Sequence, residues 1–377
     1  MQWESLLECE RFSLRRSGRF LIADLREAHR VLSTSVRHGG QVDHLRHLLN
    51  HQSCEGTGHH DRHRLMTEGG LDAYHDLVCG EAGLPPDLTA VMGTAANMSY
   101  ASVAQEADAG VAVTAVITAG VEGNATAAGE PASWRETDTG IEKLPAYAGT
   151  INTMLLINRP LTPAALARTI VTMTEGKSAA LQRLAVPSRL HPDLATGTGT
   201  DQYCVAVPTS NERPLTSASP HMKLGELVGL ATRKATLEAL RWQNGLEPSY
   251  TRGLFHALGR FGVKEATVFG DIAPLLSEPD VELLRKNARP VFYDPLVGAA
   301  AHALAAVCDR IRYGTLPDSV AADAMAQQAA ALAANVAAQV SRWTEFRSAL
   351  RPHANGDVKA LVLRAVALGW SEKWRTG

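Results

Sequence analysis

The chain has 377 residues, of which 45% are hydrophobic and 20% are charged, and its formal net charge is −2. This composition is typical of an ordinary globular protein with enough length for one large or two modest domains. The near-neutral charge gives no electrostatic reason to expect a nucleic acid or an anionic membrane as a partner. Five scattered cysteines without a CxxC pair argue against a disulfide framework or a cysteine-rich zinc site. Charges interrupt the first 25 residues and no apolar run approaches the roughly 20 residues of a membrane span, so we expect a cytoplasmic protein.

The first third of the chain predicts mainly strands. Residues 11–37 alternate in short patches that are typical of strands joined by turns. Residues 38–70, rich in glycine and histidine, predict one or two helical turns followed by irregular structure. Residues 88–96 predict a strand, with a helix after it through Glu106.

The next segments predict a mixed sheet. Residues 110–121 form a β-branched run bounded by glycine, which indicates a strand, and a connector rich in small residues follows over 122–146. Residues 149–161 predict another strand in a central position. Thr162 and Pro163 are typical of a helix start, and this helix runs to about Leu184.

A loop over 195–201 and a strand "QYCVAV" come next, and Ser219 with Pro220 predict a second helix that ends near Trp242. Because the two strands 110–121 and 149–161 have no helix between them, residues 1–245 indicate an α+β domain with a mixed β-sheet and flanking helices.

The composition changes after this point. Residues 318–341 are almost purely an alanine-rich helix, and 357–369 predict one more. We therefore expect residues 246–377 to form an all-helical C-terminal extension. It offers no residues with obvious chemistry, and packing or contact between copies in a homo-oligomer is the interpretation that we favour.

The loop "ATGTGTD" at 195–201 does not fit either common nucleotide motif. It has no lysine for a phosphate-binding P-loop, and it has no third glycine and no following helix for a dinucleotide fingerprint. What remains are three hydroxyls, the carboxylate of Asp201 and unobstructed backbone N–H groups, which can bind amides and oxyanions. A tight turn that needs glycine dihedrals is the alternative, and both interpretations stay open at this point.

Two helices supply further candidates. At 100° per residue, Lys177 falls inside the apolar stripe of the helix 163–184, whereas Glu175 points the opposite way. A lysine on an apolar face must extend its amine to solvent, pair with a carboxylate or lose its charge. His221 is predicted at the N-terminus of the second helix, where the helix dipole favours neutral imidazole suited to acid–base chemistry. Its alternative role is to help cap that helix.

The segment "NHQSCEGTGHHDRHR" brings together His51, His59, His60, Asp61 and His63. Histidine near carboxylate can bind zinc or another divalent metal, but the spacing matches no metalloprotease pattern. A solvated polar loop is the favoured interpretation, and we expect no metal site and no cofactor.

Seven short stretches, taken together and in this order, resemble one known family. They are "NHQ" (50–52), "MGTAANM" (92–98), "TAGVEGNA" (118–125), "GTINTMLLI" (149–157), "TEGKSAAL" (174–181), "ATGTGTD" (195–201) and "SASPHMKLGELVG" (217–229). The set resembles the adenosylcobinamide amidohydrolases of the CbiZ type and covers roughly residues 12–240. None of the stretches is diagnostic alone, whereas the ordered set is specific.

The resemblance implies hydrolysis of the amide that joins a propionyl side chain of a corrinoid to aminopropanol, in adenosylcobinamide or in related pseudocobalamins. The product would be adenosylcobyric acid, in salvage and remodelling of corrinoids for coenzyme B12. The cobalt would then belong to the substrate.

Amide hydrolysis needs a nucleophile or activated water, a base, a proton donor and an oxyanion site. Asp201 and His221 are the candidates for base and acid, and Glu175 and Lys177 for a charged pair, although the helix geometry disfavours that pair. A covalent route through Thr150, Thr198 or Ser217 is an alternative to activated water. The substrate-binding candidates, which include the oxyanion donors, are Asn97, Asn124, Thr150, Asn152, Thr198, Gly199, Thr200 and Ser217.

Two rival functions stay open at this point. One is a corrinoid carrier or sensor that binds without cleaving, with His59 or His60 as a cobalt ligand. The other is a hydrolase of a different amide or ester that reuses the family fold.

Overall fold

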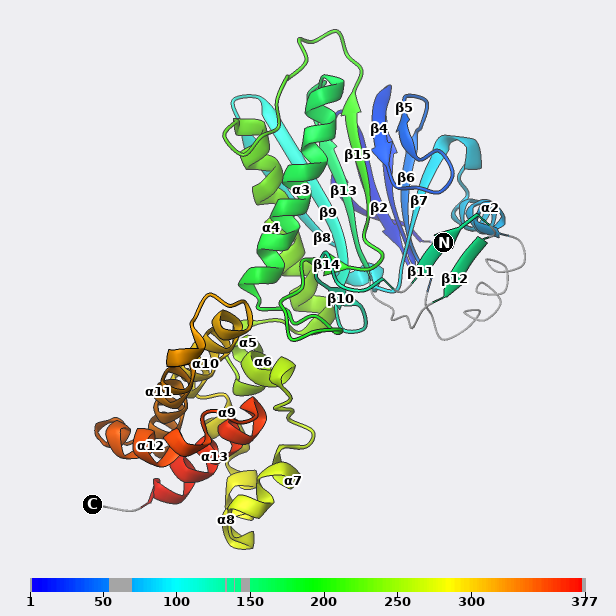
Figure 1. Ribbon diagram of the computed structural model, residues 1–377. Helices are drawn as coiled ribbons and strands as arrows, with labels where there is room; N and C mark the ends of the chain where they lie inside the picture. Colours follow the sequence, from blue (N-terminus) through cyan, green and yellow to red (C-terminus); the bar gives the residue numbers. More distant parts are fainter. Residues whose placement is uncertain (1, 54–69, 133, 139, 144–149, 375–377) are drawn as a thin grey trace. The chain divides into compact units, whose positions relative to one another are not determined.

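A computed structural model describes residues 2–53, 70–132, 134–138, 140–143 and 150–374. The chain divides into two compact units. One unit consists of Met1–Leu190 and Leu194–Gly245, and the other of His191–Asp193 and Leu246–Gly377 (Figure 1). The division after Gly245 coincides with the boundary drawn from the change in composition.

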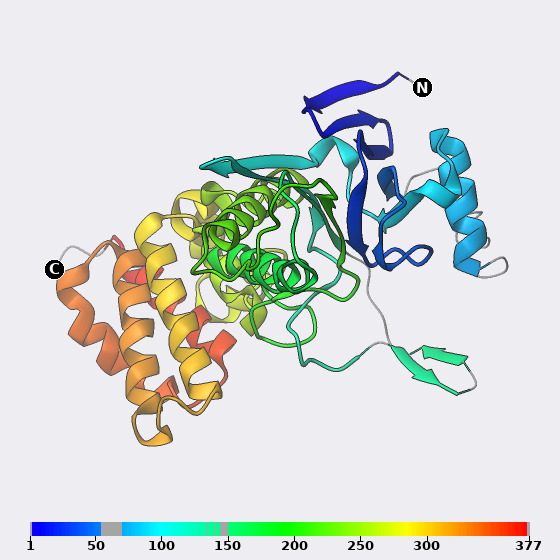
Figure 2. The ribbon, with the colours of Figure 1, turned by 90° about the horizontal axis from the view of Figure 1, so that it is seen from above.

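The first unit contains two facing β-sheets with helices on the outer faces (Figures 1 and 2). In each sheet a single pair of neighbours is parallel, β13 with β15 and β6 with β7, and the described remainder is antiparallel. The predicted α+β fold with a mixed sheet is therefore confirmed. The five-stranded sheet has the order β1 (Glu4–Glu8), β2 (Phe12–Ser17), β3 (Phe20–Leu25), β6 (His47–Gln52) and β7 (Thr89–Thr94). The six-stranded sheet has the order β5 (Gly40–Val42), β4 (His29–Ser33), β15 (Gln202–Pro208), β13 (Thr150–Ile157), β9 (Val111–Gly120) and β8 (Ser102–Asp108).

Side-chain alternation assigns each face of a strand to a layer. Met154 and Cys204, with their neighbours two residues on, point between the sheets into a shared apolar core with Leu21 and Met92. The opposite face of the six-stranded sheet is covered by α3 (Pro163–Arg183) and α4 (Lys223–Asn244) (Figure 1). Helix α2 (Gly70–Ala82) packs on the outer face of the five-stranded sheet through Tyr74, Val78 and Cys79 (Figure 2).

The helix predicted through Glu106 is wrong, because Ser102–Asp108 is strand β8. It forms a hairpin with β9 across Ala109 and Gly110, whose φ angles are +44° and +82°. Two consecutive residues with positive φ are typical of the tight turn that matches the twist of antiparallel strands. The helical turns predicted after residue 38 are also wrong over 38–53, where β5 and β6 lie. The connector over 122–146 holds the short strands β10 (Ala125–Thr126), β11 (Trp134–Thr137) and β12 (Gly140–Lys143).

Thr162 caps α3 as predicted, since its hydroxyl accepts the N–H of Ala165 at 3.3 Å. The predicted start of α4 at Ser219 is wrong, because the helix begins at Lys223. The carbonyl of Ser219 accepts the N–H of Met222 and lies where a Cβ on Gly225 would be, at 2.0 Å. The chain therefore makes a turn that folds over Gly225 before the helix begins.

The second unit is helical over its described residues and has a core of its own. The alanine-rich segment is helix α11 (Asp318–Ala337), and α13 (Val358–Glu372) packs against it. Gly369 explains the close approach, since a Cβ there would lie 2.4 Å from the carbonyl oxygen of Ala333. Small side chains on both helices thus form this interface inside the unit, and assembly of copies through these helices stays a prediction. The remaining helices are α5 (Pro248–Thr251), α6 (Leu254–Leu258), α7 (Val268–Ile272), α8 (Glu278–Lys286), α9 (Ala288–Phe292), α10 (Pro295–Arg312) and α12 (Trp343–Leu350).

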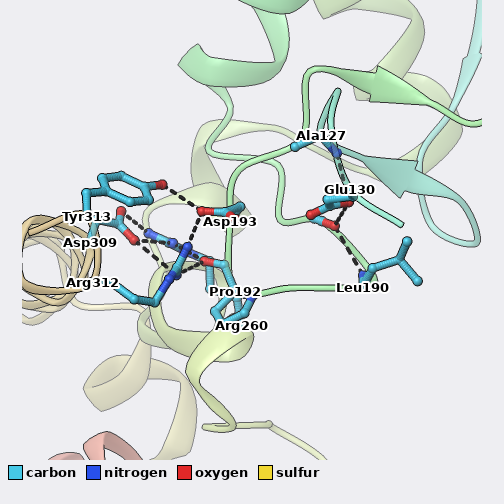
Figure 3. A network of polar contacts seen from close by, with 10 residues as sticks. Ala127, Glu130, Leu190, Pro192, Asp193, Arg260, Asp309, Arg312 and Tyr313 are labelled. Atoms are coloured by element: carbon cyan, nitrogen blue, oxygen red, sulfur yellow. Dashed lines mark hydrogen bonds and ion pairs between the residues drawn. The ribbon is translucent and has the colours of Figure 1, made fainter. Parts of the chain in front are cut away.

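Hydrogen bonds and an ion pair from Arg260, Arg312 and Tyr313 hold the segment His191–Asp193 within this helical unit (Figure 3). The guanidinium of Arg260 donates to both carboxylate oxygens of Asp309 at 2.6 and 2.7 Å, and their side chains are only 6% and 11% exposed. Arg260 and Arg312 both donate to the carbonyl of Pro192. The Tyr313 hydroxyl donates to Asp193 at 2.7 Å, and this bond with the nearby Arg312 lowers the pKa of that carboxyl.

Candidate active site

Asp201 is the centre of a hydrogen-bonded cluster at the end of the six-stranded sheet where β13 and β15 begin. One carboxylate oxygen accepts the amine of Lys177 and, at 3.2 Å, the N–H of Thr198. The other accepts the Thr198 hydroxyl at 2.5 Å and the N–H of Ile151 at 3.0 Å. The side chains of Lys177 and Asp201 are 14% and 19% exposed, so the pair is largely shielded from water. Below we call Asp201, Lys177 and Thr198 the Asp201 cluster.

Helix packing places Lys177 in this cluster. Gly176 lies directly against α4, since a Cβ there would be 2.8 Å from the carbonyl of Gly229. This face of α3 is therefore closed to solvent, and the lysine satisfies its charge with a carboxylate, one of the three outcomes that the sequence allowed. Glu175 is exposed, so the predicted charged pair of Glu175 with Lys177 is wrong, because Asp201 takes the amine instead.

The loop that carries Thr198 is held by a short antiparallel pair, in which β14 (Gly197–Thr198) lies beside β10. The carboxylate of Glu130 fixes the chain after β10 by accepting the N–H of Ala127 at 2.9 Å and the hydroxyl of Ser188 at 2.7 Å (Figure 3). These contacts leave little freedom for the backbone that presents Thr198 to Asp201.

Several of the predicted binding residues lie around this loop. The hydroxyls of Thr150 and Thr200 are 2.7 Å apart. Gly199 lies under the side chain of Asn124, since a Cβ on the glycine would be 3.1 Å from Asn124 Oδ1. Gly199 N–H also points at the Asn124 carbonyl, at 3.4 Å. The structure thus brings Thr150, Asn124 and residues 198–200 together.

A second polar cluster lies between the two sheets at the same end. Asn152 is fully buried, and its amide nitrogen donates to Asn50 Oδ1 at 2.9 Å and to the carbonyl of Gly93 at 3.0 Å. Asn50 donates in turn to Thr118 at 2.8 Å. The Asn152 Oδ1 atom is buried and has no hydrogen-bond partner among the described residues. A buried acceptor that is left unpaired is costly, which makes this atom a candidate contact for a ligand donor.

Asn97 follows β7, at the same end of the sheets, and has a structural role. Its side chain accepts the N–H of Ser99 at 2.9 Å, which caps a turn of 3-10 helix. Its own N–H donates to Gln243 near the end of α4, at 2.9 Å, and Val121 N–H donates to Asn244 at 3.2 Å. The C-terminal end of α4 therefore lies beside Asn97, at the end of the sheets that holds the two polar clusters.

His221 is not part of this arrangement. It is exposed and precedes Lys223, the first residue of α4, whereas the last residues of that helix contact the edge of the sheet described above. A helix of 22 residues is about 33 Å long, so His221 lies at the opposite end of the sheet from Asp201. Ser217 lies in the same far segment. The expectation of one site with both Asp201 and His221 is wrong, because the chain direction of α4 separates them.

His59, His60 and His63 lie outside the described residues. Within the described ranges, histidine, cysteine, aspartate and glutamate side chains form no group of three or more that could hold a metal ion.

Sequence reasoning gave no role to Asn50, Tyr74 and Gln202, and it named His51 only among the histidines of a possible metal cluster. His51 is fully buried at the end of β6, its Nδ1 lies 2.7 Å from the hydroxyl of Tyr74, and Gln202 accepts the N–H of Gly93 at 2.9 Å. Burial lowers the pKa of His51 to about 3, so the imidazole is neutral near pH 7. The stretch "NHQ" was the signal that could have singled out Asn50 and His51.

The first unit is thus an α+β protein with buried polar clusters at one end of two facing sheets. Residues 6–248 match the family model of the adenosylcobinamide amidohydrolases. The chain is also 35% identical over 183 residues to the uncharacterized protein MJ1613 of Methanocaldococcus jannaschii, and the alignment covers 46% of this chain and 71% of that relative. The chain belongs to the adenosylcobinamide amidohydrolase family.

The match covers the unit that holds the Asp201 cluster and leaves nearly all of the helical unit outside. No helix in the described part of the chain has the length and apolar character that crossing a bilayer requires.

Proposed function

We propose that this protein hydrolyses the amide that joins a propionyl side chain of adenosylcobinamide, or of a related pseudocobalamin, to aminopropanol. The products are adenosylcobyric acid and the free amine, which assigns the enzyme to corrinoid salvage and remodelling. The observation that carries the proposal is that the segment matching the amidohydrolase family contains a carboxylate, an ammonium and a hydroxyl in direct contact.

We assign the nucleophile to Thr198, because its hydroxyl already donates to Asp201 at 2.5 Å. Asp201 takes the hydroxyl proton as the oxygen attacks the amide carbon, which raises the nucleophilicity of an otherwise weak group. The ammonium of Lys177 offsets the charge of Asp201 and protonates the nitrogen as the C–N bond breaks. Water then cleaves the resulting ester and returns Thr198 to its starting state.

The developing negative charge on the amide oxygen needs hydrogen-bond donors. The N–H groups of Gly199 and Thr200 are the candidates, because their bonds to the Asn124 carbonyl and the Thr198 hydroxyl are long, both 3.4 Å, and a substrate oxygen would replace those acceptors. Thr150 supports this loop through Thr200. The carboxamide of Asn152 contributes a contact on the substrate side through its unpaired Oδ1.

The proposal is tested by incubating the purified full-length protein with adenosylcobinamide and following adenosylcobyric acid and aminopropanol by liquid chromatography and mass spectrometry. Thr198→Ala should abolish turnover, and Thr198→Ser should retain part of it and allow the acyl ester to be trapped at low pH. Gly120→Ala is a matched control at the same edge, since its Cβ would meet only ordinary contacts at 3.8 and 3.9 Å. Corrinoid binding without product over hours would instead favour a carrier or sensor, and full turnover by Thr198→Ala would refute the assigned nucleophile.

A further inference from the structure

On the outer face of the five-stranded sheet, on the side of α2, the Nε2 of His51, unpaired within the described part of the chain, and the space left by the missing side chain of Gly93 form what we call the recess, and the assigned reaction steps do not use it. His51 in β6 and Gly93 in β7 are paired across the two parallel strands. Paired residues in neighbouring strands direct their side chains to the same face, about 4.8 Å apart. The face in question carries Leu49 and Val91, which pack under α2.

The imidazole of His51 has two defined contacts, and one of its nitrogens has no hydrogen-bond partner among the described residues. Its ring stacks on Phe20 with centroids 5.2 Å apart, and its Nδ1 lies 2.7 Å from the hydroxyl of Tyr74. The His51 side chain is fully buried. Its Nε2 has no hydrogen-bond partner among the described residues. Buried polar atoms nearly always have partners, so an oriented ring with one unmatched nitrogen indicates a ligand contact.

Gly93 leaves room beside this ring. A Cβ built on Gly93 would meet a single non-neighbouring atom within 4 Å, the hydroxyl oxygen of Tyr74 at 3.7 Å. Gly93 is half-buried, whereas His51 is not exposed at all, so the recess borders the surface at the glycine. The peptide of Gly93 also binds Asn152 and Gln202, which connects the recess to the polar cluster between the sheets.

We propose that His51, Tyr74 and Gly93 form a subsite that binds an uncharged carboxamide group of the substrate. The proposal rests on the amidohydrolase function proposed above. A primary carboxamide offers both N–H donors and a carbonyl acceptor, so it complements Nε2 whichever ring nitrogen carries the proton. Corrinoid rings carry such groups around their edge, and the recess is linked to the Asp201 cluster through Gln202, which follows Asp201 and accepts the N–H of Gly93.

The chemistry of the recess favours the amide over the corresponding carboxylate. A buried carboxylate needs a charged partner or several donors, and the groups that line the recess are a neutral imidazole and a phenol. The nearest cation, Arg19, is engaged with Glu81 at 3.1 Å. Burial lowers the pKa of His51 to about 3, so the ring does not supply a positive charge near neutral pH.

Gly93→Ala is the test variant, because its methyl group fills the recess at an ordinary contact distance. Gly80→Ala is the matched control, since Gly80 is exposed on α2 and its Cβ would meet nothing within 4 Å. His51→Gln and Tyr74→Phe remove the two polar contacts without a large change in volume. Steady-state kinetics with adenosylcobinamide and with its side-chain monocarboxylate derivatives measure the discrimination.

We expect Gly93→Ala to raise KM roughly tenfold with kcat within about twofold, the effect of one lost hydrogen-bonded contact. The preference of the wild type for amide over carboxylate should disappear in Gly93→Ala and His51→Gln and persist in Gly80→Ala. Wild-type KM and wild-type discrimination in both test variants would overturn the subsite.

Equilibrium binding of adenosylcobinamide separates this idea from the proposed reaction. If the wild type binds without hydrolysis and Gly93→Ala binds more weakly, the subsite stands and the hydrolytic function fails. If the wild type hydrolyses the substrate and the variants bind as tightly as it does, the subsite alone fails. If the wild type does not bind, both are refuted.

Discussion

Replacing Gly197 with alanine should separate the charged pair at the centre of the candidate site. The added Cβ would lie 2.6 Å from Asp201 Oδ2 and 2.8 Å from Lys177 Nζ. Non-bonded contacts of carbon become favourable near about 3.5 Å, so the two groups must withdraw by roughly 0.7 to 0.9 Å. A misplacement of about 1 Å in catalytic groups costs on the order of a hundredfold in rate. We therefore expect kcat/KM to fall about a hundredfold, a loss of about 2.7 kcal/mol of transition-state stabilisation.

The assay is turnover of adenosylcobinamide, followed together with the thermal unfolding midpoint. Gly120→Ala adds the same methyl group at the same edge with contacts of 3.8 and 3.9 Å, so it should keep activity within about twofold. Since Gly197 does not have a positive φ, alanine is compatible with its backbone, and the Gly197→Ala protein should fold. A folded Gly197→Ala enzyme with the wild-type rate would refute the role of the Asp201–Lys177 contact.

Three further predictions concern single side chains. Lys177→Met should lower kcat/KM at least about tenfold and destabilise the fold by roughly 1–2 kcal/mol, because it leaves the partly shielded Asp201 without its cation. Unchanged kinetics together with an unchanged denaturant midpoint would contradict this prediction. His221→Ala should keep kcat/KM within about twofold, because that residue lies at the far end of the sheet, and a tenfold loss would restore it to the site. The pKa of His51 is about 3 in the folded protein and near 6.5 when unfolded, so between these values the unfolded state binds the extra proton and stability falls as pH falls. From pH 7 to 5 the wild type should lose about 2 kcal/mol more than His51→Gln in urea titrations, and parallel curves would disprove the assigned burial.

Helical periodicity singled out Lys177 but did not predict its partner. The position of Lys177 on the apolar stripe of α3 allowed its amine to extend to solvent, to pair with a carboxylate or to lose its charge, and the structure shows the pair with Asp201. Periodicity fixes only which face of a helix a residue occupies. The partner carboxylate, Asp201, is brought to Lys177 by the fold and could not be identified from the spacing of the two residues in the chain.

Chain direction explains why the acid–base pair of Asp201 and His221 was wrong. Two residues can belong to the same helix layer and still lie at opposite ends of the sheet that the layer covers. Helix α4 begins at the end of the six-stranded sheet opposite Asp201. The expected cap at Ser219 also failed, because Gly225 lets the preceding turn fold over the helix and delays its start to Lys223. The pattern of Ser219 and Pro220 indicated a helix start but carried no information on the contact of the Ser219 carbonyl with Gly225.

The buried polar residues were hidden for a different reason. Asn50 and His51 follow two leucines in strand β6, and alternation assigns them to opposite faces of one sheet. Their partners, Asn152 and Tyr74, come from segments 102 and 23 residues away. Since hydrogen-bond satisfaction depends on these distant partners, the sequence could supply the residue types but not the unmatched atoms.

The loop 195–201 was interpreted either as a binding loop or as a tight turn that needs glycine dihedrals. The structure shows why glycine occurs at 197 and 199. Neither Gly197 nor Gly199 adopts a positive φ, so the loop does not need glycine for a left-handed turn. Instead, a side chain at Gly197 would collide with Asp201 and Lys177, and one at Gly199 would crowd Asn124. Glycine is therefore required here because charged and amide groups approach the backbone closely. The close approach at Gly197 lets the Asp201 carboxylate reach both Lys177 and the Thr198 hydroxyl.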